Sequence, residues 1–287
     1  MPDRNSATLL INCPDAKGLV ASVSGFLFQH GANILSTDEH RDDVSGQFFM
    51  RIEWDLSDFG LDSGTFRIAF ESAVARRFEM QWRVEYSSRP LRVAIFVSKY
   101  LHCFADLLHR HRTGELPCQI ALVVSNHREA EALAGFYGIP FHHIPMQGAN
   151  KAEAEARQIA LLEEHGVDLV VLARYMQVLS GGFVARFPGR VINVHHSFLP
   201  AFSGARPYHA AFERGVKLIG ATAHYVTEIL DDGPIIDQEV IRVSHRDQLE
   251  DLVEKGRDAE RMVLSRAVRW HLQHRVLLYG NKTVVFV

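Results

Sequence analysis

Apolar and polar positions along the first 86 residues alternate between strand-like runs and stretches with helical spacing. In the helical stretches the apolar side chains recur every three or four residues, as expected for a helix with one buried face. The strand-like runs cover residues 7–13, 33–41, 47–56 and 80–86, and the helical stretches cover residues 19–31 and 64–78. This βαββαβ order predicts a ferredoxin-like domain.

Beyond residues 87–91 the pattern changes to near-continuous apolar runs separated by helical stretches, which is typical of parallel strands buried on both faces. The runs cover residues 91–98, 118–125, 167–174 and 190–197, the helical stretches cover 101–111, 127–137 and 151–165, and strands at 221–227 and 234–243 and a helix at 247–273 follow. This order predicts a doubly wound, mostly parallel sheet. We therefore expect an α/β protein with a domain at residues 1–86, a linker at 87–91 and a second domain at 92–287.

The overall composition excludes several classes of protein. The chain has 287 residues, and 31 Lys and Arg against 34 Asp and Glu give a net charge of −3, without the basic blocks that nucleic-acid binding needs. No apolar run approaches the roughly 18–20 residues of a membrane span, and the N-terminal apolar stretch is too short for a signal peptide. Cys13, Cys103 and Cys118 are few, odd in number and far apart, which is typical of free thiols. We expect a cytoplasmic protein without a nucleic-acid or membrane partner.

The 16 histidines are the one unusual feature of the composition, and they raise the question of a metal site. Neither an HExxH motif nor a CxxC pair is present, so a site would have to be assembled from scattered ligands. His109 and His111 fall on different faces of a helix, and His142 and His143 fall in an expected loop. We interpret these four as surface or partly buried polar side chains and expect no metal ion.

Asn193 and His195 stand at the end of the apolar run at residues 190–194. Ligands bind outside the carboxyl ends of parallel strands, and residues two apart in a strand share a face. An amide donor beside an imidazole suits stabilisation of an oxyanion together with proton transfer. The spacing alone also fits a hydrogen-bonded strand end, so both interpretations stay open. His196 faces the opposite way and is expected to be structural.

A turn of sequence DDGP, residues 231–234, joins the last two long strands. Asp and Gly are standard turn formers, but a carboxylate on such a turn can also orient a nearby histidine and hold or deprotonate a water molecule. His224 lies in the preceding strand among apolar neighbours. It is therefore either a core histidine with its hydrogen bonds satisfied or a partner of Asp231.

The wording INVHHSFLPAF, GARPYH, GATAHYV and LDDGP between Ile192 and Pro234 resembles the formyltransferase core of enzymes that use 10-formyltetrahydrofolate. Within that group it is most similar to the formyltetrahydrofolate deformylases, and the resemblance spans most of residues 92–287. It implies hydrolysis of 10-formyltetrahydrofolate to formate and tetrahydrofolate, which feeds one-carbon and purine metabolism. The folate is the substrate, so no cofactor is implied.

The resemblance also implies roles for individual residues. Asn193, His195 and Asp231 correspond to the catalytic trio of the family. The segments at residues 172–179 and 226–231 correspond to the folate pocket, and the implied substrate-binding residues are Arg174, Met176, Gln177, Leu179, Ser197, His224 and Val226. The transferases usually carry Arg where Gln177 stands, so we expect a side-chain contact to differ at this position.

One segment distinguishes this chain from the transferase that acts on glycinamide ribonucleotide. That enzyme has a Gly-rich loop after its first strand for the substrate phosphate, whereas residues 97–102 here read VSKYLH, without glycine. Bulky side chains prevent close approach of the backbone to a phosphate, which leaves water as the alternative acceptor. A transferase with another amine acceptor, a folate-binding sensor without turnover and a metal-dependent hydrolase remain alternatives.

The first 86 residues resemble an ACT domain, a class that commonly binds amino acids between two copies. The implied regulatory ligand site comprises Asp15, Gly18, Leu19, Asn33 and Ile34, and a glycine at a helix N-terminus lets backbone N–H groups face a carboxylate. The resemblance thus implies an amino-acid effector and a homo-oligomer formed through this domain. The alternative is that Gly18 only shapes a turn and that the domain serves dimerisation alone.

Overall fold

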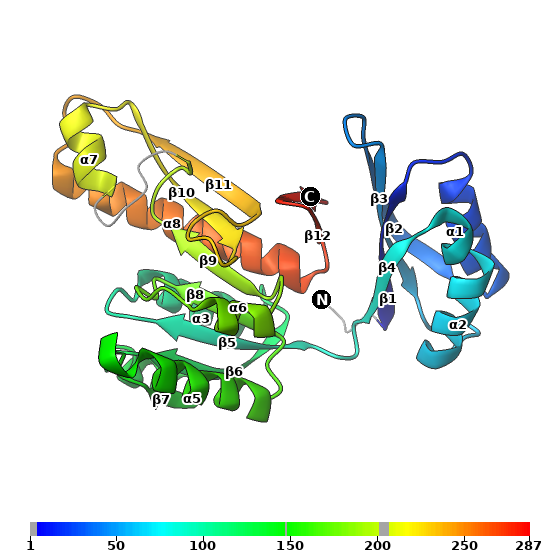
Figure 1. Ribbon diagram of the computed structural model, residues 1–287, viewed down its shortest axis with the longest axis horizontal. Coiled ribbons are helices and arrows are strands. Elements are labelled where there is room, and N and C mark those ends of the chain that lie inside the picture. The colour runs from blue at the N-terminus through cyan, green and yellow to red at the C-terminus, as the bar shows by residue number, and fades with distance from the viewer. Residues whose placement is uncertain (1–4, 147, 201–206) are drawn as a thin grey trace. The chain divides into compact units, whose positions relative to one another are not determined.

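The computed structural model of the chain describes residues 5–146, 148–200 and 207–287, which fold into two compact units (Figure 1). The first unit extends to Pro90 and includes residues 274–279 and 284–287, and the second comprises residues 91–273 and 280–283. Residues 201–206 carry part of the family-like wording (AFSGAR) and lie outside the described residues.

The first unit contains a four-stranded antiparallel sheet with the strand order β2-β3-β1-β4. Its elements follow the βαββαβ order expected from the hydrophobic pattern: β1 (Ser6–Pro14), α1 (Leu19–Gln29), β2 (Asn33–Asp42), β3 (Gln47–Asp55), α2 (Ser63–Ala73), the 3-10 helix η1 (Ala75–Phe78) and β4 (Gln81–Tyr86). The single helix predicted over residues 64–78 is thus divided into α2 and η1. The helical turns change at Val74, which has φ −128° and cannot continue an α-helix.

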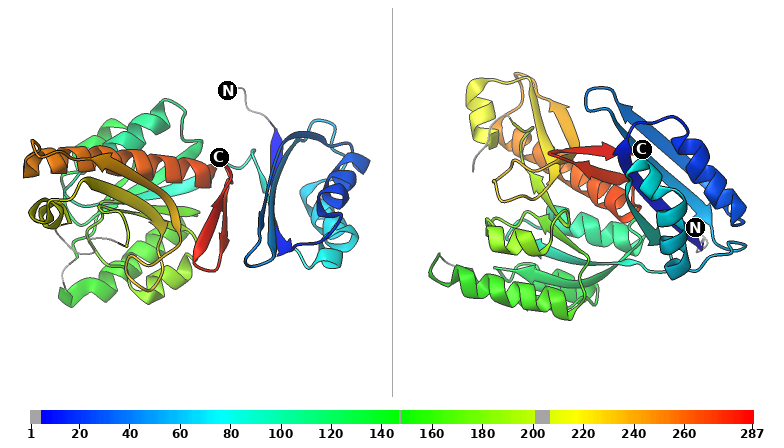
Figure 2. Two further views of the ribbon diagram at one scale, coloured as in Figure 1. Left: turned by 90° about the horizontal axis from the view of Figure 1, so that it is seen from above. Right: turned by 45° about the vertical axis from the view of Figure 1, so that its right-hand side comes forward.

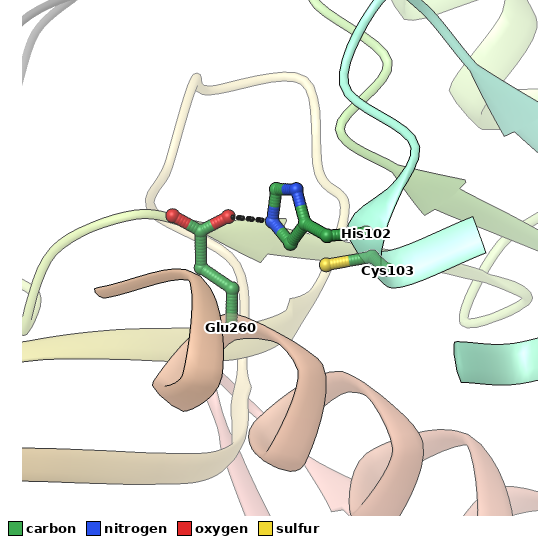
Figure 3. Close-up of side chains that lie close together, drawn as sticks. All are labelled: His102, Cys103 and Glu260. Carbon is green, nitrogen blue, oxygen red and sulfur yellow. Dashed lines mark hydrogen bonds and ion pairs between the residues drawn. The ribbon is translucent and has the colours of Figure 1, made fainter. Parts of the chain in front are cut away.

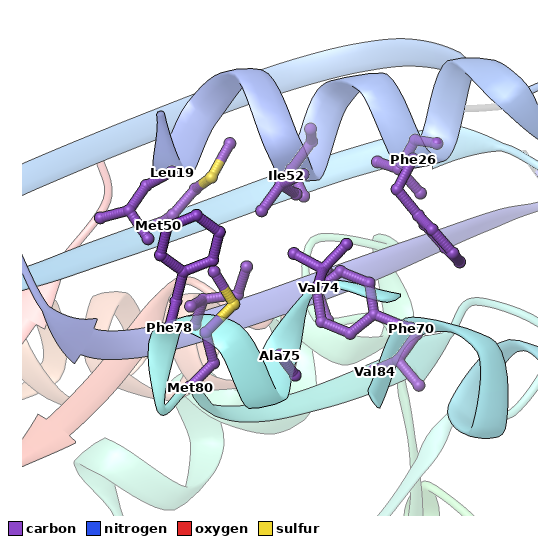
Figure 4. Close-up of a cluster of buried hydrophobic side chains, with 14 of the residues drawn as sticks. Leu19, Phe26, Met50, Ile52, Phe70, Val74, Ala75, Phe78, Met80 and Val84 are labelled. Atoms are coloured by element: carbon purple, nitrogen blue, oxygen red, sulfur yellow. The ribbon is translucent and has the colours of Figure 1, made fainter. Parts of the chain in front are cut away.

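Alternation along β1 and β3 sends side chains to two differently covered faces of this sheet. Leu19 and Phe26 of α1 face Met50 and Ile52 of β3 in the core between the helices and the sheet (Figure 4). The opposite face carries a smaller apolar cluster formed by Leu10, Phe49, Leu277 and Phe286. The sheet of the first unit is therefore buried on both faces.

The C-terminal segment, with strands β12 (Val276–Tyr279) and β13 (Lys282–Val285), supplies one half of this smaller apolar cluster. Arg51 Nε donates to the carbonyl of His274, and Arg83 Nη2 donates to the carbonyl of Val276, at 3.2 and 3.0 Å. These contacts hold residues 274–279 to the first unit. The sequence pattern predicts this segment in a domain at residues 92–287, and the structure differs. The hydrogen-bonded residues are more than 190 positions apart in the chain, so no local pattern indicates that they meet.

The second unit is built on a seven-stranded sheet with the order β11-β10-β9-β8-β5-β6-β7. The strands from β9 to β7 are parallel, whereas β10 and β11 run antiparallel at one edge, so the predicted mostly parallel sheet is confirmed. The strands are β5 (Leu91–Val97), β6 (Cys118–Ser125), β7 (Phe141–His143), β8 (Leu169–Ala173), β9 (Val191–His195), β10 (Leu218–Tyr225) and β11 (Ile235–Arg242).

Helices cover both faces of this sheet, as further views show (Figure 2). Helices α5 and α6 pack on one face, while α8 lies against β9, β10 and β11 on the other and contacts α3 and α7. The helices are α3 (His102–Arg112), α4 (Glu131–Phe136), η2 (Gly148–Asn150), α5 (Lys151–Glu164), α6 (Gly181–Arg186), α7 (Pro207–Arg214) and α8 (Leu249–Leu272). Among the described residues, no helix combines the length and apolar character needed to cross a membrane.

Two local expectations are corrected by the structure. His142 and His143 were expected in a loop but belong to β7, an edge strand of three residues. The helix expected at residues 127–137 is shortened to the six residues of α4, and the short helices α6 and α7 were not predicted.

The order in which the chain adds strands reverses between β5 and β8, because β6 and β7 lie on one side of β5 and β8 and β9 lie on the other. Helix α3 after β5 therefore lies on one face of the sheet, and α6 after β8 lies on the other. Such a switch point opens a crevice at the carboxyl ends of the two strands, and ligands of open α/β sheets bind there. The loops that follow β5 and β8 are therefore expected to border a ligand site.

Candidate active site

Asn193 and His195 are the third and last residues of β9, and they face the same side of the sheet as predicted. The antiparallel neighbour β10 brings His224 directly opposite Asn193 in the register. Residues paired in this way have neighbouring side chains. The strand pairing therefore unites two of the predicted residues with a histidine that sequence left ambiguous.

Asp231 completes the group from the turn between β10 and β11. Its Oδ2 lies 3.2 Å from His195 Nδ1, and its Oδ1 lies 3.7 Å from His224 Nε2. Asn193 Nδ2 lies 3.3 Å from the same His224 nitrogen. The structure thus brings the three predicted catalytic residues together and adds His224 as their common neighbour.

His224 is 2% exposed, and its ring orients Asn193. Its Nδ1 lies 2.9 Å from the carbonyl oxygen of Tyr225. A carbonyl can only accept, so Nδ1 carries a proton, and in the neutral ring Nε2 accepts a hydrogen bond from Asn193. This contact fixes one N–H of the Asn193 amide and leaves the second N–H for another acceptor.

The carboxylate of Asp231 fixes the orientation of His195. A hydrogen bond from His195, together with the nearby His224 ring, holds the pKa of the Asp231 carboxyl well below its usual range, against the opposing effect of partial burial. Asp231 is therefore a weak base and a stable acceptor for the Nδ1–H of His195. Within the described part of the chain, His195 Nε2 is buried and has no hydrogen-bond partner. This nitrogen is the atom of the group left for a bound molecule.

The DDGP turn places Asp231 by a close approach of two backbone segments. Asp231 has φ +55°, and the amide of Tyr225 donates to the carbonyl of Pro234 at 2.9 Å. A Cβ atom on Gly233 would lie 1.8 Å from the carbonyl oxygen of Tyr225, a distance that no side chain tolerates. Glycine at position 233 is thus required for the turn that carries the carboxylate.

The loop after β8, residues 174–180, is held at several points. The Oγ of Ser98 accepts from the amide of Met176 at 3.1 Å, and Glu155 of α5 accepts from the amide of Ser180 at 2.9 Å. At the start of the loop, the buried Tyr175 hydroxyl accepts from Gln158 at 2.9 Å. The loop is therefore fixed before any ligand binds.

Some of the predicted folate-binding residues lie on an exposed apolar surface. Met176 in the loop after β8 is exposed, and so are its neighbour Val178 and, in the turn after β10, Ile229 and Leu230. Gln177 lies at intermediate exposure between Met176 and Val178. An apolar surface of this kind beside a polar group is the usual composition of a small-molecule site.

Other predicted substrate-binding residues lie behind this surface. Leu179 and Val226 pack into the core under α5 and α6. Ser197 is buried, and its carbonyl accepts from Thr222 Oγ1 at 2.9 Å, while the same hydroxyl accepts from the amide of Leu199 at 3.1 Å. The side chains of Leu179 and Val226 and the backbone of Ser197 therefore support the site from within.

Arg174 points to a separate group of residues. Its Nε lies 3.5 Å from Oε2 of Glu260, and that oxygen also lies 2.7 Å from His102 Nε2. The other oxygen, Oε1, accepts from the Tyr208 hydroxyl at 2.7 Å. We call Arg174, His102, Tyr208 and Glu260 the Glu260 cluster.

Sequence reasoning missed Glu260, although a signal for it exists. Leu252, Gly256, Glu260 and Leu264 recur every four residues and are all buried on one face of α8. A carboxylate on an apolar helix face is rare unless it is paired. His102 and Tyr208 gave no comparable signal, because their partner lies in a distant helix.

Figure 3 shows His102 and Cys103 at the start of α3 facing Glu260 of α8. Ligand atoms of these three residues lie within 4.8 Å of one another, the arrangement that a metal ion would require. Burial raises the pKa of the Cys103 thiol well above its usual value, so a thiolate is disfavoured. Both oxygens of Glu260 are engaged, and the nearby guanidinium of Arg174 opposes a cation. The chemistry of this group therefore does not favour a metal ion.

The residues of the expected regulatory site lie in the first unit. Gly18 has φ +88° and stands before α1 without a side-chain cap, and Asp15 forms an ion pair of 2.7 Å with Arg41. Asn33 and Ile34 are exposed at the start of β2, whereas the Leu19 side chain is buried in the core. Only the backbone of Leu19 is thus available to a ligand.

Comparisons with known proteins identify the family of the chain. Residues 91–268 match the formyl transferase family model. The chain is 52% identical to a formyltetrahydrofolate deformylase of Synechocystis sp., over 98% of each chain. It resembles the crystal structure of a formyltetrahydrofolate deformylase from Pseudomonas syringae with a TM-score of 0.96 and 49% identity, over 99% of this chain and 95% of that one.

A more distant structure marks the part of the chain that is shared with transferases. Glycinamide ribonucleotide transformylase 1 from Symbiobacterium toebii is 30% identical, with a TM-score of 0.66. The match covers 97% of that chain but only 70% of this one.

Proposed function

Because the chain belongs to the formyltetrahydrofolate deformylases, we propose that it hydrolyses 10-formyltetrahydrofolate to formate and tetrahydrofolate at Asn193, His195 and Asp231. The observation that carries this assignment is the state of His195. Its Nδ1 is held by Asp231, and its Nε2 is buried and without a partner among the described residues. A histidine oriented in this way is prepared to move a proton to or from a bound molecule.

The reaction begins with the attack of water on the formyl carbon, which forms a C–O bond and a tetrahedral oxyanion. The second N–H of Asn193 donates to the oxyanion, since His224 occupies the first. His195 Nε2 takes a proton from the attacking water and passes it to N10 as the C–N bond breaks. Asp231 stabilises the imidazolium in between without becoming protonated, in line with its low pKa. The second proton of the water leaves with formic acid, which ionises to formate.

We propose that the pterin binds along the loop after β8 and the turn after β10. The exposed apolar side chains of Met176, Val178, Ile229 and Leu230 support this position. Gln177 would contact the folate through its side-chain amide, and Leu179 and Val226 would support the pocket from the core.

We propose that the reaction needs no metal ion and no other cofactor. The unfavourable charge and protonation state of the group at His102, Cys103 and Glu260 support this proposal. The three cysteines are free, which fits a cytoplasmic location.

For the first unit we propose an ACT domain that binds an amino acid and joins two or more copies of the chain. The βαββαβ order supports the domain type, and the uncapped N-terminus of α1 behind Gly18 supports a carboxylate ligand. Strand β2 lies at a sheet edge with largely exposed side chains, so its backbone can pair with a second copy.

Calorimetry of the full chain against the twenty amino acids tests for the ligand, and light scattering tests for the oligomer. If none of the amino acids bound, the proposed effector site would be contradicted and only the role in assembly would be left for this domain.

The function is tested by supplying 10-formyltetrahydrofolate with a labelled formyl group, alone and with glycinamide ribonucleotide. We expect the label in formate under both conditions. Label that appears only in formylated glycinamide ribonucleotide would instead show a transferase.

A further inference from the structure

The Glu260 cluster is connected to the catalytic histidine through the ring of His196. The His195 and His196 rings are 5.1 Å apart between centroids, and the His196 and Tyr208 rings are 6.0 Å apart. Arg174 follows β8 directly, and β8 pairs with β9 in the register that places Leu172 beside Asn193. The cluster therefore approaches His195 through Tyr208 and through the end of the adjacent strand.

The cluster is closely packed and is unlike a surface network. Glu260 is 1% exposed and Tyr208 is 8% exposed. A Cβ atom on Gly256, one turn before Glu260, would lie 2.2 Å from the Tyr208 ring, so the ring rests directly on the backbone of α8. A buried carboxylate that loses a partner is strongly destabilised. The hydrogen bonds to Glu260 thus keep the side chains of His102 and Tyr208 in fixed positions.

Two residues of the cluster follow the strands at the switch point between β5 and β8, where ligands of such sheets bind. His102 stands at the start of α3 and Arg174 directly after β8, and Tyr100 covers the guanidinium of Arg174 with 5.3 Å between the ring centroid and the Arg174 Cζ. An amine acceptor needs room for its own substituents beside the formyl carbon. Water needs room for one oxygen atom.

From this arrangement we infer that the Glu260 cluster closes the acceptor side of the site and thereby restricts the reaction to water. The inference rests on the proposed function. His102 and Tyr208 act as specificity-determining residues, and Glu260 and Gly256 position them. If the acceptor side is opened, a small primary amine takes the place of water. A bond then forms between the formyl carbon and the amine nitrogen, the bond to N10 breaks, and one proton passes from the amine to N10.

The test measures the partition between the two acceptors. The full chain receives 10-formyltetrahydrofolate with a labelled formyl carbon and a high concentration of glycinamide, and mass spectrometry gives the ratio of N-formylglycinamide to formate. The variants are His102→Ala and Tyr208→Ala, with His109→Ala at the exposed end of the same helix α3 and Tyr208→Phe as controls. The ratio is set within each turnover, so a smaller folded fraction of a variant does not alter it.

We expect the wild type and both controls to form only a trace of N-formylglycinamide beside formate, because Tyr208→Phe keeps the ring that fills the space and rests on the backbone at Gly256. The two alanine variants should raise the ratio by about 10-fold to 100-fold, the usual effect of a pocket-filling group on discrimination. Wild-type ratios in both alanine variants would overturn the inference while leaving hydrolysis intact. A wild type that releases no formate from 10-formyltetrahydrofolate alone would instead contradict the proposed function.

Discussion

At the scale of single residues, the site depends on which nitrogen of each histidine is engaged. His224 uses Nδ1 on a backbone carbonyl and turns Nε2 toward Asn193, whereas His195 uses Nδ1 on Asp231 and leaves Nε2 without a partner among the described residues. The two rings therefore have different tasks. His224 orients the amide that receives the oxyanion, and His195 moves the proton.

Strand periodicity was sufficient to predict part of this arrangement. Asn193 and His195 share a face because they are two residues apart at the end of a buried strand. The alternatives for His224 could not be decided from sequence, because its partners come from β9 and from a turn. His102 and Tyr208 were missed for the same reason, since hydrogen bonds between separate helices leave no local pattern, whereas the helical spacing around Glu260 did carry a signal.

We expect Asn193→Ala to remain folded and to lower kcat by about 100-fold to 1,000-fold, because one donor to the oxyanion is lost. Steady-state formate release gives kcat, and circular dichroism checks the fold. A variant with near-normal kcat would remove Asn193 from the proposed mechanism.

Asp231 should also affect stability as a function of pH. Its pKa is depressed in the folded chain, so its stabilising contribution is complete above the unfolded value of about 3.9 and is lost as the pH falls toward the folded pKa. We expect Asp231→Asn to lower the free energy of unfolding at neutral pH, and we expect the difference from wild type to shrink below about pH 4. Urea unfolding across this range measures it. A difference that does not depend on pH would contradict the hydrogen bond from His195 to the Asp231 carboxylate.

At the scale of elements, two connections determine the site, namely the loop after β8 and the turn after β10. Sequence predicted the strands that they follow, because buried parallel strands have near-continuous apolar runs. It could not predict the conformation of either connection. The loop depends on Ser98 and Glu155, which lie in other elements, and the turn depends on a backbone approach that only the folded chain reveals.

The turn is tested by Gly233→Ala. A Cβ atom 1.8 Å from the Tyr225 carbonyl oxygen forces the turn to move and takes Asp231 away from His195. We expect a loss of activity of at least about 100-fold, comparable to the loss of a catalytic group. Gly135→Ala in α4 is the matched control, because a Cβ atom at that position meets no atom within 4 Å. Normal formate release by Gly233→Ala would show that the turn can shift without affecting Asp231.

At the scale of the whole molecule, residues 274–279 and 284–287 belong to the first unit although the chain reaches them through α8 of the second. Hydrophobic patterning predicted two domains and the change of pattern near residues 87–91. It placed the last strands, of four residues each, in the domain at residues 92–287, because their apolar side chains are compatible with any sheet face and do not indicate their true partners. Leu277 and Phe286 find Leu10 and Phe49 only in the folded chain.

Phe286→Ala should therefore destabilise the first unit, by about 3–5 kcal/mol for a buried phenylalanine. Urea unfolding followed by the fluorescence of Trp54 and Trp82, which both lie in this unit, reports the change. Val287→Ala, next in sequence and 79% exposed, should leave the transition unchanged. Equal stability of the two variants would show that the apolar cluster with Leu10 and Phe49 contributes little.

Hydrolysis with water as the formyl acceptor is tested most directly in water labelled with ¹⁸O. The full chain is treated with a chelator and then incubated with 10-formyltetrahydrofolate and no amine, and formate and tetrahydrofolate are both quantified. We expect equal amounts of the two products and one ¹⁸O atom in each formate. Absence of formate under these conditions, or formate without the label, would contradict attack of water at Asn193, His195 and Asp231.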